Sequence, residues 1–445
     1  MKRKNMIKMS MKKTGTLSVL ILLLSILLVF ALTSCSEAGS EVILSKDELR
    51  ENATRGIPED AEYVRDCLDG WQFPLFDGSK MLDVEYVFEK KFYISLPELS
   101  TLAARTAEIF LDEYYDTVEL GNKDAVTDAL LYSYVDAIDD RYSYYRTAEE
   151  YEGYKTGLSG NFVGVGITVR QDEESGNILV TEVLEGGGAA DAGVLAGDII
   201  VAVDGKYVSD VGYSDAINSV RGEEGTFAVL TVQRDGAKIE LSAERRPIVE
   251  KSVTYSITDG IGYIRITSFN ANTDEQFYEA IDEMERVGVS GVIYDVRSNG
   301  GGYLSSVENM LDYIAPKGLT LASFSNGYSD DYVAKDRHTF LIPTVVLVNG
   351  STASAAELFA AGIRDMAAMG YMKATVVGTT TLGKGVMQTT YRLGDGSAVT
   401  LTVAYYNPPS GVNYNGVGII PAVTEENVAE QINTAYAEIT KLIND

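Results

Sequence analysis

The chain beyond residue 247 alternates short apolar stretches with amphipathic ones. The expected strands are GIGYIRIT, SGVIYDVRS and TVVLVNG, and the expected helices are TDEQFYEAIDEMERVG, SSVENMLDYIAP and ASAAELFAAGIRDMAAMG. Strands that are apolar along nearly their whole length are typical of a parallel sheet covered on both faces. A regular succession of strand and helix is typical of an α/β layer architecture. We therefore predict an α/β core over residues 248–445.

Residues 158–247 have a different pattern, with short strands separated by glycine and aspartate turns and a short helix at YSDAINSVRG. The segment LEGGGAADAGVLAGDIIVAVDG resembles the core of a PDZ domain, and any other small β-rich domain is the alternative. In that binding mode, backbone amides of a glycine-containing loop hold a chain-terminal carboxylate, and the peptide adds as a strand to a sheet edge. The resemblance places the peptide site at Val163, Gly164, Val165 and Gly166.

The N-terminus has the composition of an export signal. Residues 1–34 contain six basic residues, no acid, and the apolar run Leu17–Leu32, which is short for a bilayer span. The run ends in LTSC, which resembles a bacterial lipoprotein box, in which the chain is cleaved before Cys35 and Cys35 is acylated. An uncleaved N-terminal anchor is the alternative. Both interpretations place the body of the protein outside the cytoplasm, and the first attaches it by lipid to the extracytoplasmic face of the membrane.

Charge and composition exclude several classes of function. The net charge is −28, and it becomes more negative when the basic residues 1–34 are removed, so the body repels nucleic acid. Cys35 and Cys67 are the only cysteines, and no intramolecular disulfide can form if Cys35 is acylated. His338 is the only histidine, so a metal site with several histidine ligands cannot exist. We expect no metal and no cofactor.

Two regions precede the β-rich domain. Residues 35–95 match no pattern and are predicted to be a tether and accessory segment. Residues 96–157 have apolar positions at helical spacing and are predicted to form two or three helices. Because these amphipathic helices have no evident partner, a homo-oligomer is a hypothesis, which a monomeric mass by light scattering would contradict.

One serine has a setting that suits catalysis. In VVLVNGSTASAAELFAAG, Ser354 follows a buried strand and precedes a helix. An ordinary helix N-cap is the simplest interpretation. The same place also suits a nucleophile, because free amides and the positive end of the helix dipole stabilise an oxyanion. The glycines after Asn299 in YDVRSNGGGYL would supply further amides, unless they form only a tight turn.

One lysine fits the role of a general base. Lys384 lies in GTTTLGKGVMQ, which has the glycine and lysine spacing of a phosphate-binding loop. That motif requires Ser or Thr after the lysine and a following helix, whereas Gly385 and a predicted strand follow here. A serine hydrolase without histidine can use a lysine whose pKa is lowered by burial. No acid occurs from Met366 through Gly394, and Gln388 can orient an amine through a neutral amide.

These motifs together resemble the carboxy-terminal processing, or tail-specific, protease family. The similarity runs from about Ala107 to Val423 and includes DDRYSYYRTAEEY, SVRGEEGTFAVLTVQRDG, DVRSNGGG, STASAAE, GKGVMQ and NPPSGVNYNGVGIIPAV. The family consists of serine peptidases with a Ser-Lys dyad, an embedded PDZ domain and a core related to the crotonase and Clp-protease superhelix. The resemblance implies that Ser354 is the nucleophile, Lys384 the general base and Gln388 the residue that orients the lysine.

The same resemblance implies further roles. The amides of Ala355 and of Gly301 or Gly302 would form the oxyanion hole. Arg221, the fifth residue assigned to the peptide site, would couple the PDZ domain to the core. Substrates would be polypeptides with unstructured C-terminal tails. The sequence departs from the family pattern at two points. Ala356 stands where the family motif commonly has a serine. The interval between Ser354 and Lys384 is longer than expected, and the extra loop is predicted in MAAMGYMKA. The alternative functions are a non-catalytic PDZ scaffold and a crotonase-like acyl enzyme.

Overall fold

The computed structural model describes residues 76–445, apart from 94–95, 98, 120 and 326–330. The predictions for residues 1–75, which include the signal segment, Cys35 and Cys67, lie outside the described residues. Among the described helices, none is both long enough and apolar enough to cross a membrane. The described residues form two compact units: one contains residues 76–153, 324–325 and 386–406, and the other contains residues 154–323, 331–385 and 407–445.

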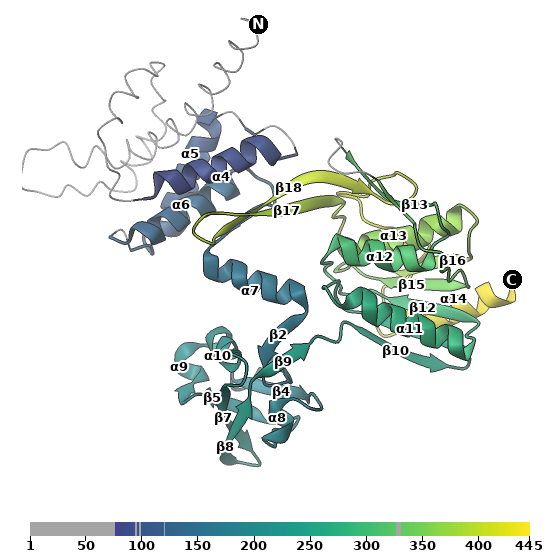
Figure 1. The fold of residues 1–445 in the computed structure, drawn as a ribbon, viewed down its shortest axis with the longest axis horizontal. Helices are drawn as coiled ribbons and strands as arrows, with labels where there is room; N and C mark the ends of the chain where they lie inside the picture. The colour runs from purple at the N-terminus through teal and green to yellow at the C-terminus, as the bar shows by residue number, and fades with distance from the viewer. Residues whose placement is uncertain (1–75, 94–95, 98, 120, 326–330) are drawn as a thin grey trace, which may run out of the picture. The chain divides into compact units, whose positions relative to one another are not determined.

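A six-stranded sheet forms the centre of the second unit (Figure 1). Its strands, in spatial order, are β10 (Val253–Thr258), β11 (Ile261–Ile266), β12 (Gly291–Asp295), β15 (Thr344–Val348), β16 (Ala374–Gly378) and β19 (Val423–Thr424). Its helices are α11 (Thr273–Val287), α12 (Leu304–Ile314), α13 (Ala355–Ala368) and α14 (Gln431–Asn444). Only β10 runs antiparallel to its neighbour. The alternation of strands and helices predicted from the sequence is confirmed.

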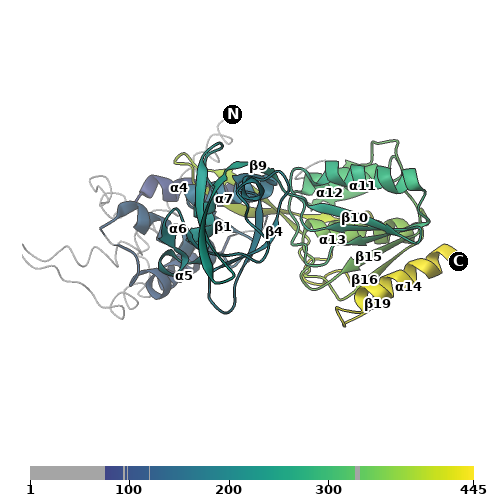
Figure 2. The ribbon, with the colours of Figure 1, turned by 90° about the horizontal axis from the view of Figure 1, so that it is seen from below.

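Helices cover both faces of this sheet, and Figure 2 shows α14 on the opposite side from α11 and α12. On β12, side chains alternate between the two faces. Ile293 packs with Ala435 and Ile439 of α14. The ring of the next residue, Tyr294, lies 5.3 Å from that of Phe359 on α13. Because each face of the strand meets a helix layer, every residue of β12 is buried, which explains its continuous apolar sequence.

A small β-rich domain precedes the core in the chain. Its antiparallel sheet has the order β3-β4-β5-β7-β8, with β6 beside β5. The bounds are β2 (Asn161–Gly164), β3 (Ile167–Gln171), β4 (Ile178–Val183), α8 (Gly188–Asp191), β5 (Ile199–Val203), β6 (Lys206–Tyr207), α9 (Val208–Val211), α10 (Tyr213–Val220), β7 (Phe227–Arg234), β8 (Ala237–Glu244) and β9 (Arg246–Val249). Strands β2 and β9 pair where the chain enters and leaves the domain, and β3 is the edge strand of the sheet.

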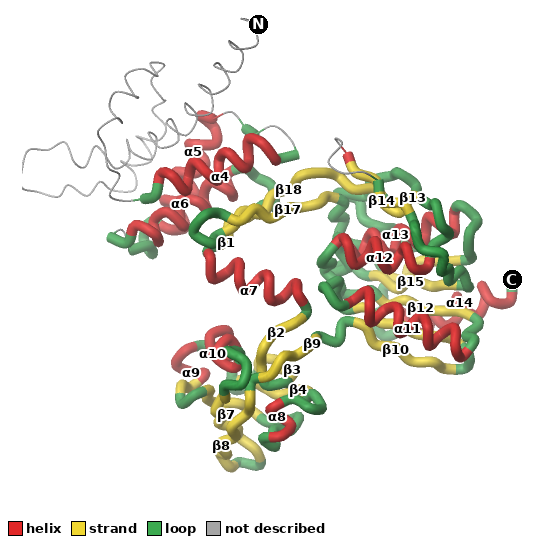
Figure 3. The backbone as a smooth tube through the Cα atoms, in the orientation of Figure 1, coloured by secondary structure: helices red, strands yellow, loops and turns green. Residues whose placement is uncertain are grey.

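The first unit combines helices with a long hairpin, seen as two neighbouring strands in Figure 3. Its elements are α4 (Gly78–Lys91), α5 (Leu99–Ile109), the π-helical turn η1 (Phe110–Tyr114), α6 (Lys123–Ala137), β1 (Tyr144–Arg146), β17 (Val386–Arg392) and β18 (Ala398–Asn407). Helix α7 (Ala148–Ser159) leads to the second unit, where β13 (Thr320–Phe324) and β14 (Tyr332–Val333) pair. The strand predicted after Lys384 is therefore confirmed as β17.

A partly buried cation fixes the tip of the hairpin. The ammonium of Lys80 lies 2.8 Å from the carboxylates of both Asp128 and Asp395, and Asp395 belongs to the turn between β17 and β18. Burial alone would lower the pKa of Lys80, but the hydrogen bonds to Asp128 and Asp395 raise it above its ordinary value. The helices and the hairpin are thus joined through one ion-pair network, and the hairpin is held at the end opposite Gln388.

Candidate active site

Three loops leave the carboxyl ends of neighbouring strands in the parallel sheet. The glycine loop 300–302 follows β12, Ser354 follows β15, and Lys384 follows β16. Strand β15 lies between β12 and β16, so the serine loop is flanked by the other two. In open α/β sheets, ligands bind at the carboxyl ends of the strands. The fold thus places three segments that are distant in sequence at one edge of the sheet.

Ser354 has a backbone conformation unlike that of an ordinary helix cap. Its φ is 57° and its ψ is −120°, whereas an N-cap normally has extended φ and ψ. A non-glycine residue in such a conformation costs about 1–3 kcal/mol and is found mainly at functional sites. A strained turn between a strand and a helix also exposes the serine nucleophile in α/β-hydrolases. The conformation therefore favours the interpretation of Ser354 as a nucleophile.

The buried carboxylate of Glu357 joins the serine loop to the lysine loop. Its Oε2 atom accepts hydrogen bonds from the amide N–H of Ser354 at 2.9 Å and of Lys384 at 2.7 Å. Its Oε1 atom accepts from the Gly383 amide at 2.7 Å and from the Thr381 hydroxyl at 2.5 Å. All four partners are donors, and the side chain is fully buried. One side chain thereby sets the spacing between the candidate nucleophile and the candidate base.

The glycine loop approaches Ser354 closely. A Cβ added to Gly301 would lie 2.8 Å from the Cβ of Ser354, so only glycine fits there. The amide of Gly301 already donates to Oδ1 of Asn299 at 2.8 Å. Among the described hydrogen bonds, the amides of Ala355 and Gly302 donate none. Of the three amides predicted to form the oxyanion hole, those of Ala355 and Gly302 therefore have no acceptor among the described hydrogen bonds, and the oxyanion hole itself stays a prediction.

The remaining predicted catalytic residue, Gln388, lies on β17 in the first unit. Its side-chain nitrogen donates to the carbonyl of Val386 and to the hydroxyl of Thr402, both at 3.3 Å. The strand has a β-bulge between Met387 and Gln388, which interrupts the regular alternation of side chains along β17. The role of Gln388 toward Lys384 stays a prediction.

The single histidine is engaged away from these loops. The His338 ring stacks on Tyr313 with centroids 4.0 Å apart, and Nδ1 lies 2.7 Å from the Tyr313 carbonyl oxygen. Nε2 lies 3.1 Å from the Glu285 carboxylate. Burial lowers the pKa of His338, but the contacts with Tyr313 and Glu285 outweigh that effect and raise it. Its partners lie on α11 and α12, so His338 has a local structural explanation.

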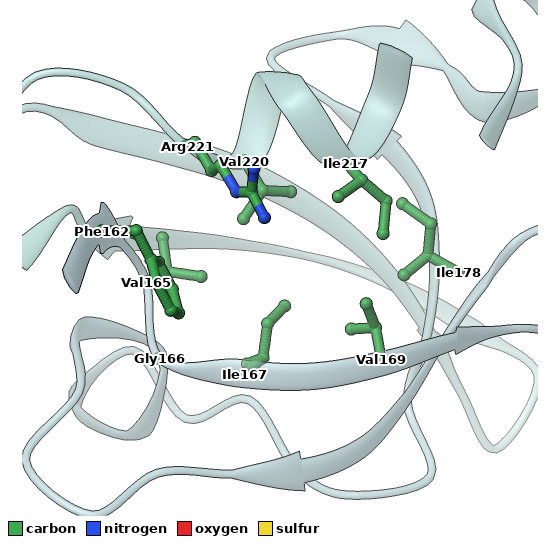
Figure 4. A pocket seen from close by; sticks show the side chains of 10 residues that line it. Phe162, Val165, Gly166, Ile167, Val169, Ile178, Ile217, Val220 and Arg221 are labelled. Carbon is green, nitrogen blue, oxygen red and sulfur yellow. The ribbon is translucent and has the colours of Figure 1, made fainter. Parts of the chain in front are cut away.

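The β-rich domain contains an apolar pocket between β3 and α10 (Figure 4). It is lined by Phe162, Gly164, Val165, Gly166, Ile167, Val169, Ile178, Ile217, Val220 and Arg221. The pocket adjoins the edge strand β3, as strand addition of a peptide requires. Gly166 has a φ of 81°, a conformation that favours glycine at this loop. Of the five residues predicted for the peptide site, Val163 alone does not line the pocket.

Arg221 occupies the polar end of this pocket. It is the third residue of the SVRG segment and follows α10 directly. Its guanidinium carbon lies 5.6 Å from the centroid of the Phe162 ring, within the range of a cation–π interaction. The pocket therefore combines an apolar lining with one cation, which suits an apolar residue that carries a terminal carboxylate.

An α/β core with serine, lysine and glycine loops at one sheet edge, together with a peptide-binding β-rich domain, defines a serine peptidase that carries a PDZ domain. Residues 260–424 match the model of Peptidase family S41, and residues 155–233 match that of the PDZ domain. The chain belongs to the carboxy-terminal processing, or CtpA-like, serine proteases of this family. The PDZ resemblance and the family resemblance of the sequence are both confirmed.

The similarity to individual members extends over most of the chain. The chain is 34% identical over 318 residues to the carboxy-terminal processing protease CtpA of Bacillus subtilis (strain 168), covering 71% of this chain and 66% of that one. It is 30% identical over 395 residues to a probable CtpA-like serine protease of Staphylococcus aureus (strain MRSA252), covering 85% and 78%. A solved photosystem II D1 C-terminal processing protease is 26% identical, covering 82% of this chain and 96% of that one, with a TM-score of 0.47.

The sequence analysis missed Glu357. A signal was present, because Ser354 and Glu357 have the S-x-x-E spacing of a capping box, in which the glutamate accepts from the amide of the cap residue. That pattern predicts the bond to Ser354. It does not predict the bonds to Thr381, Gly383 and Lys384, which depend on the β16 loop returning to the start of the helix.

Replacing Glu357 with glutamine tests whether its carboxylate joins the serine loop to the lysine loop. An amide has one acceptor oxygen, so its NH₂ group would face two of the four donors that now bind the carboxylate. We expect Glu357→Gln to slow labelling of Ser354 by a fluorophosphonate probe at least roughly tenfold and to lower the free energy of unfolding by about 1–3 kcal/mol. Labelling kinetics and urea denaturation measure the two effects.

Asp365→Asn is the matched control on the same helix. Asp365 is also buried, and its carboxylate accepts from the Ser410 amide and from Arg364. This variant should lose stability while its labelling rate, measured under folded conditions, stays near that of the parent. Equal labelling rates for Glu357→Gln and the parent would contradict the assigned role of Glu357.

The pocket gives a second prediction. Ile217→Asp places an unpaired carboxylate against the apolar lining and near the bound peptide terminus, so it should weaken binding of a peptide with an apolar C-terminal residue at least roughly tenfold. Fluorescence polarisation with a labelled peptide measures the affinity. The control Leu195→Asp changes an exposed apolar residue of the same domain and should bind like the parent. Unchanged affinity in Ile217→Asp would place the peptide elsewhere.

Proposed function

We propose that the protein is an endopeptidase that cleaves polypeptides at or near unstructured C-terminal tails through a Ser-Lys dyad. The Ser354 hydroxyl oxygen attacks the scissile carbonyl carbon, and its proton passes to the neutral amine of Lys384. The amides of Ala355 and Gly302 stabilise the resulting oxyanion. Lys384 then returns the proton to the leaving amine, and water hydrolyses the acyl-enzyme.

The observation that carries this proposal is the bond of Ser354 and Lys384 amides to the same Glu357 oxygen. A nucleophile and its base must lie within hydrogen-bond reach of each other, and this junction supports such an approach. Gln388, four residues beyond Lys384, orients the lysine amine through its neutral amide. A neutral partner avoids the rise in lysine pKa that a carboxylate partner would cause.

The PDZ pocket supports the choice of substrate. An apolar C-terminal residue fills the pocket between β3 and α10, and the preceding residues extend β3 by backbone hydrogen bonds. That mode requires an extended, unstructured tail. Arg221 lies at this pocket and is the residue through which we expect tail binding to be communicated to the peptidase core.

We propose that the protein is located at the extracytoplasmic face of a bacterial membrane, to which a lipid on Cys35 attaches it. The basic and apolar composition of residues 1–34 and the LTSC sequence support this part of the proposal.

The dyad is tested with the full chain, purified in mild detergent. The parent should cleave unfolded casein and a reporter that ends in an apolar tail. Ser354→Ala and Lys384→Ala should each lower the cleavage rate by about 10⁴-fold or more, because the members of such a catalytic group act as a unit. Gel analysis and mass spectrometry measure the products. A parent chain that binds the tail but neither cleaves it nor reacts with a fluorophosphonate probe would be a binding scaffold.

The lipid anchor is tested by the Cys35→Ser variant expressed in a bacterium that processes lipoproteins. The parent should label with a fatty-acid analogue and sediment with membranes. The variant should lose the label, because acylation needs the cysteine sulfur. Retained membrane association without the label would indicate the uncleaved anchor instead.

A further inference from the structure

A buried hydroxyl lies opposite Gln388 in the hairpin. Thr402 of β18 is paired with Gln388 of β17 in the strand register, and its side chain is fully buried. The Thr402 hydroxyl donates to the carboxylate of Asp140 at 2.7 Å. The Gln388 side-chain nitrogen lies 3.3 Å from the same hydroxyl. The three side chains form a continuous hydrogen-bonded chain within the first unit.

The chemistry of these groups fixes the direction of each hydrogen bond. A carboxylate oxygen only accepts, so the single proton of the Thr402 hydroxyl is directed to Asp140. The hydroxyl oxygen can then only accept, and only the NH₂ half of the Gln388 amide can face it. The second partner of that NH₂ group, the carbonyl of Val386, is also an acceptor. Two acceptors therefore select one of the two amide orientations of Gln388.

Asp140 is itself held in place. The hydroxyl of Ser143 donates to the same carboxylate oxygen at 2.5 Å, and the amide of Thr402 donates to the Ser143 hydroxyl at 3.2 Å. Asp140 and Ser143 belong to the DDRYSYY segment, to which the sequence analysis assigned no role. This segment links the end of α6 to β18 and so fixes the position of Thr402.

We propose that Thr402 and Asp140 are positioning residues of the peptidase. They hold the Gln388 amide nitrogen toward the Thr402 hydroxyl, so that the amide oxygen is the atom available to Lys384. The inference rests on the proposed function of Gln388. An amide oxygen accepts an N–H from the lysine amine and leaves the amine lone pair for the serine proton. The reversed amide would present donors to a group that itself donates, and the lysine would lose its orienting partner.

The test compares two buried threonines on one strand. Thr402→Val removes the hydroxyl without changing the shape of the side chain and should slow fluorophosphonate labelling of Ser354 by about three- to tenfold, the effect of one lost hydrogen bond. Thr402→Ser retains the hydroxyl and should restore the parent rate. The control Thr400→Val removes a hydroxyl that instead bonds to Thr390 and Arg146, and it should label like the parent.

A double-mutant cycle separates positioning from general stability. In a Gln388→Ala background, Thr402→Val should cause no further loss, because the hydroxyl acts through the amide that is already absent. Equal losses with and without Gln388, or a parent-like rate in Thr402→Val, would overturn the inference and leave the dyad intact. A parent-like rate in Gln388→Ala would overturn the role of Gln388 and the inference with it. A parent-like rate in Lys384→Ala would overturn the dyad itself.

Discussion

The site depends on one carboxylate that accepts four hydrogen bonds. Glu357 is buried at the start of α13, where its oxygens bind amides from the serine loop and the lysine loop. A buried carboxylate without these donors would be costly, so the loops and the glutamate stabilise one another. The β15 and β16 loops therefore cannot shift independently. The spacing between Ser354 and Lys384 therefore follows from the hydrogen bonds that both loops make to Glu357, and not from a local sequence pattern around either residue.

Much of the core could be predicted because its pattern is repeated and local. The strands around Tyr294 and Val346 are buried on both faces, and burial on both faces produces the continuous apolar runs that identify them. Parallel neighbours align their carboxyl ends, which brings together the serine, lysine and glycine loops that each follow a strand. The strand predicted after Lys384 is confirmed as β17, whereas a phosphate-binding loop is followed by a helix.

The parts that escaped prediction depend on contacts between distant segments. The hydrogen bond between Asp140 and Thr402 joins residues more than 250 positions apart, and no local sequence pattern predicts it. The bulge at Gln388 likewise depends on pairing with β18. Val163 was placed in the peptide site by its position in a glycine-containing loop, but it belongs to β2 and pairs with Pro247 instead. In each case a segment distant in the sequence supplies the partner.

The strained serine requires a rigid support, and the core supplies one. The backbone of Ser354 keeps its unfavourable conformation only if contacts with the surrounding residues stabilise it by more than the strain costs. Glu357 holds its amide from within the same helix, one turn away. Below, Phe359 packs its ring against those of Phe277 and Tyr294, with centroids 5.9 Å and 5.3 Å apart. Phe359 is the fifth residue of α13, so this packing fixes the start of the helix that directly follows Ser354.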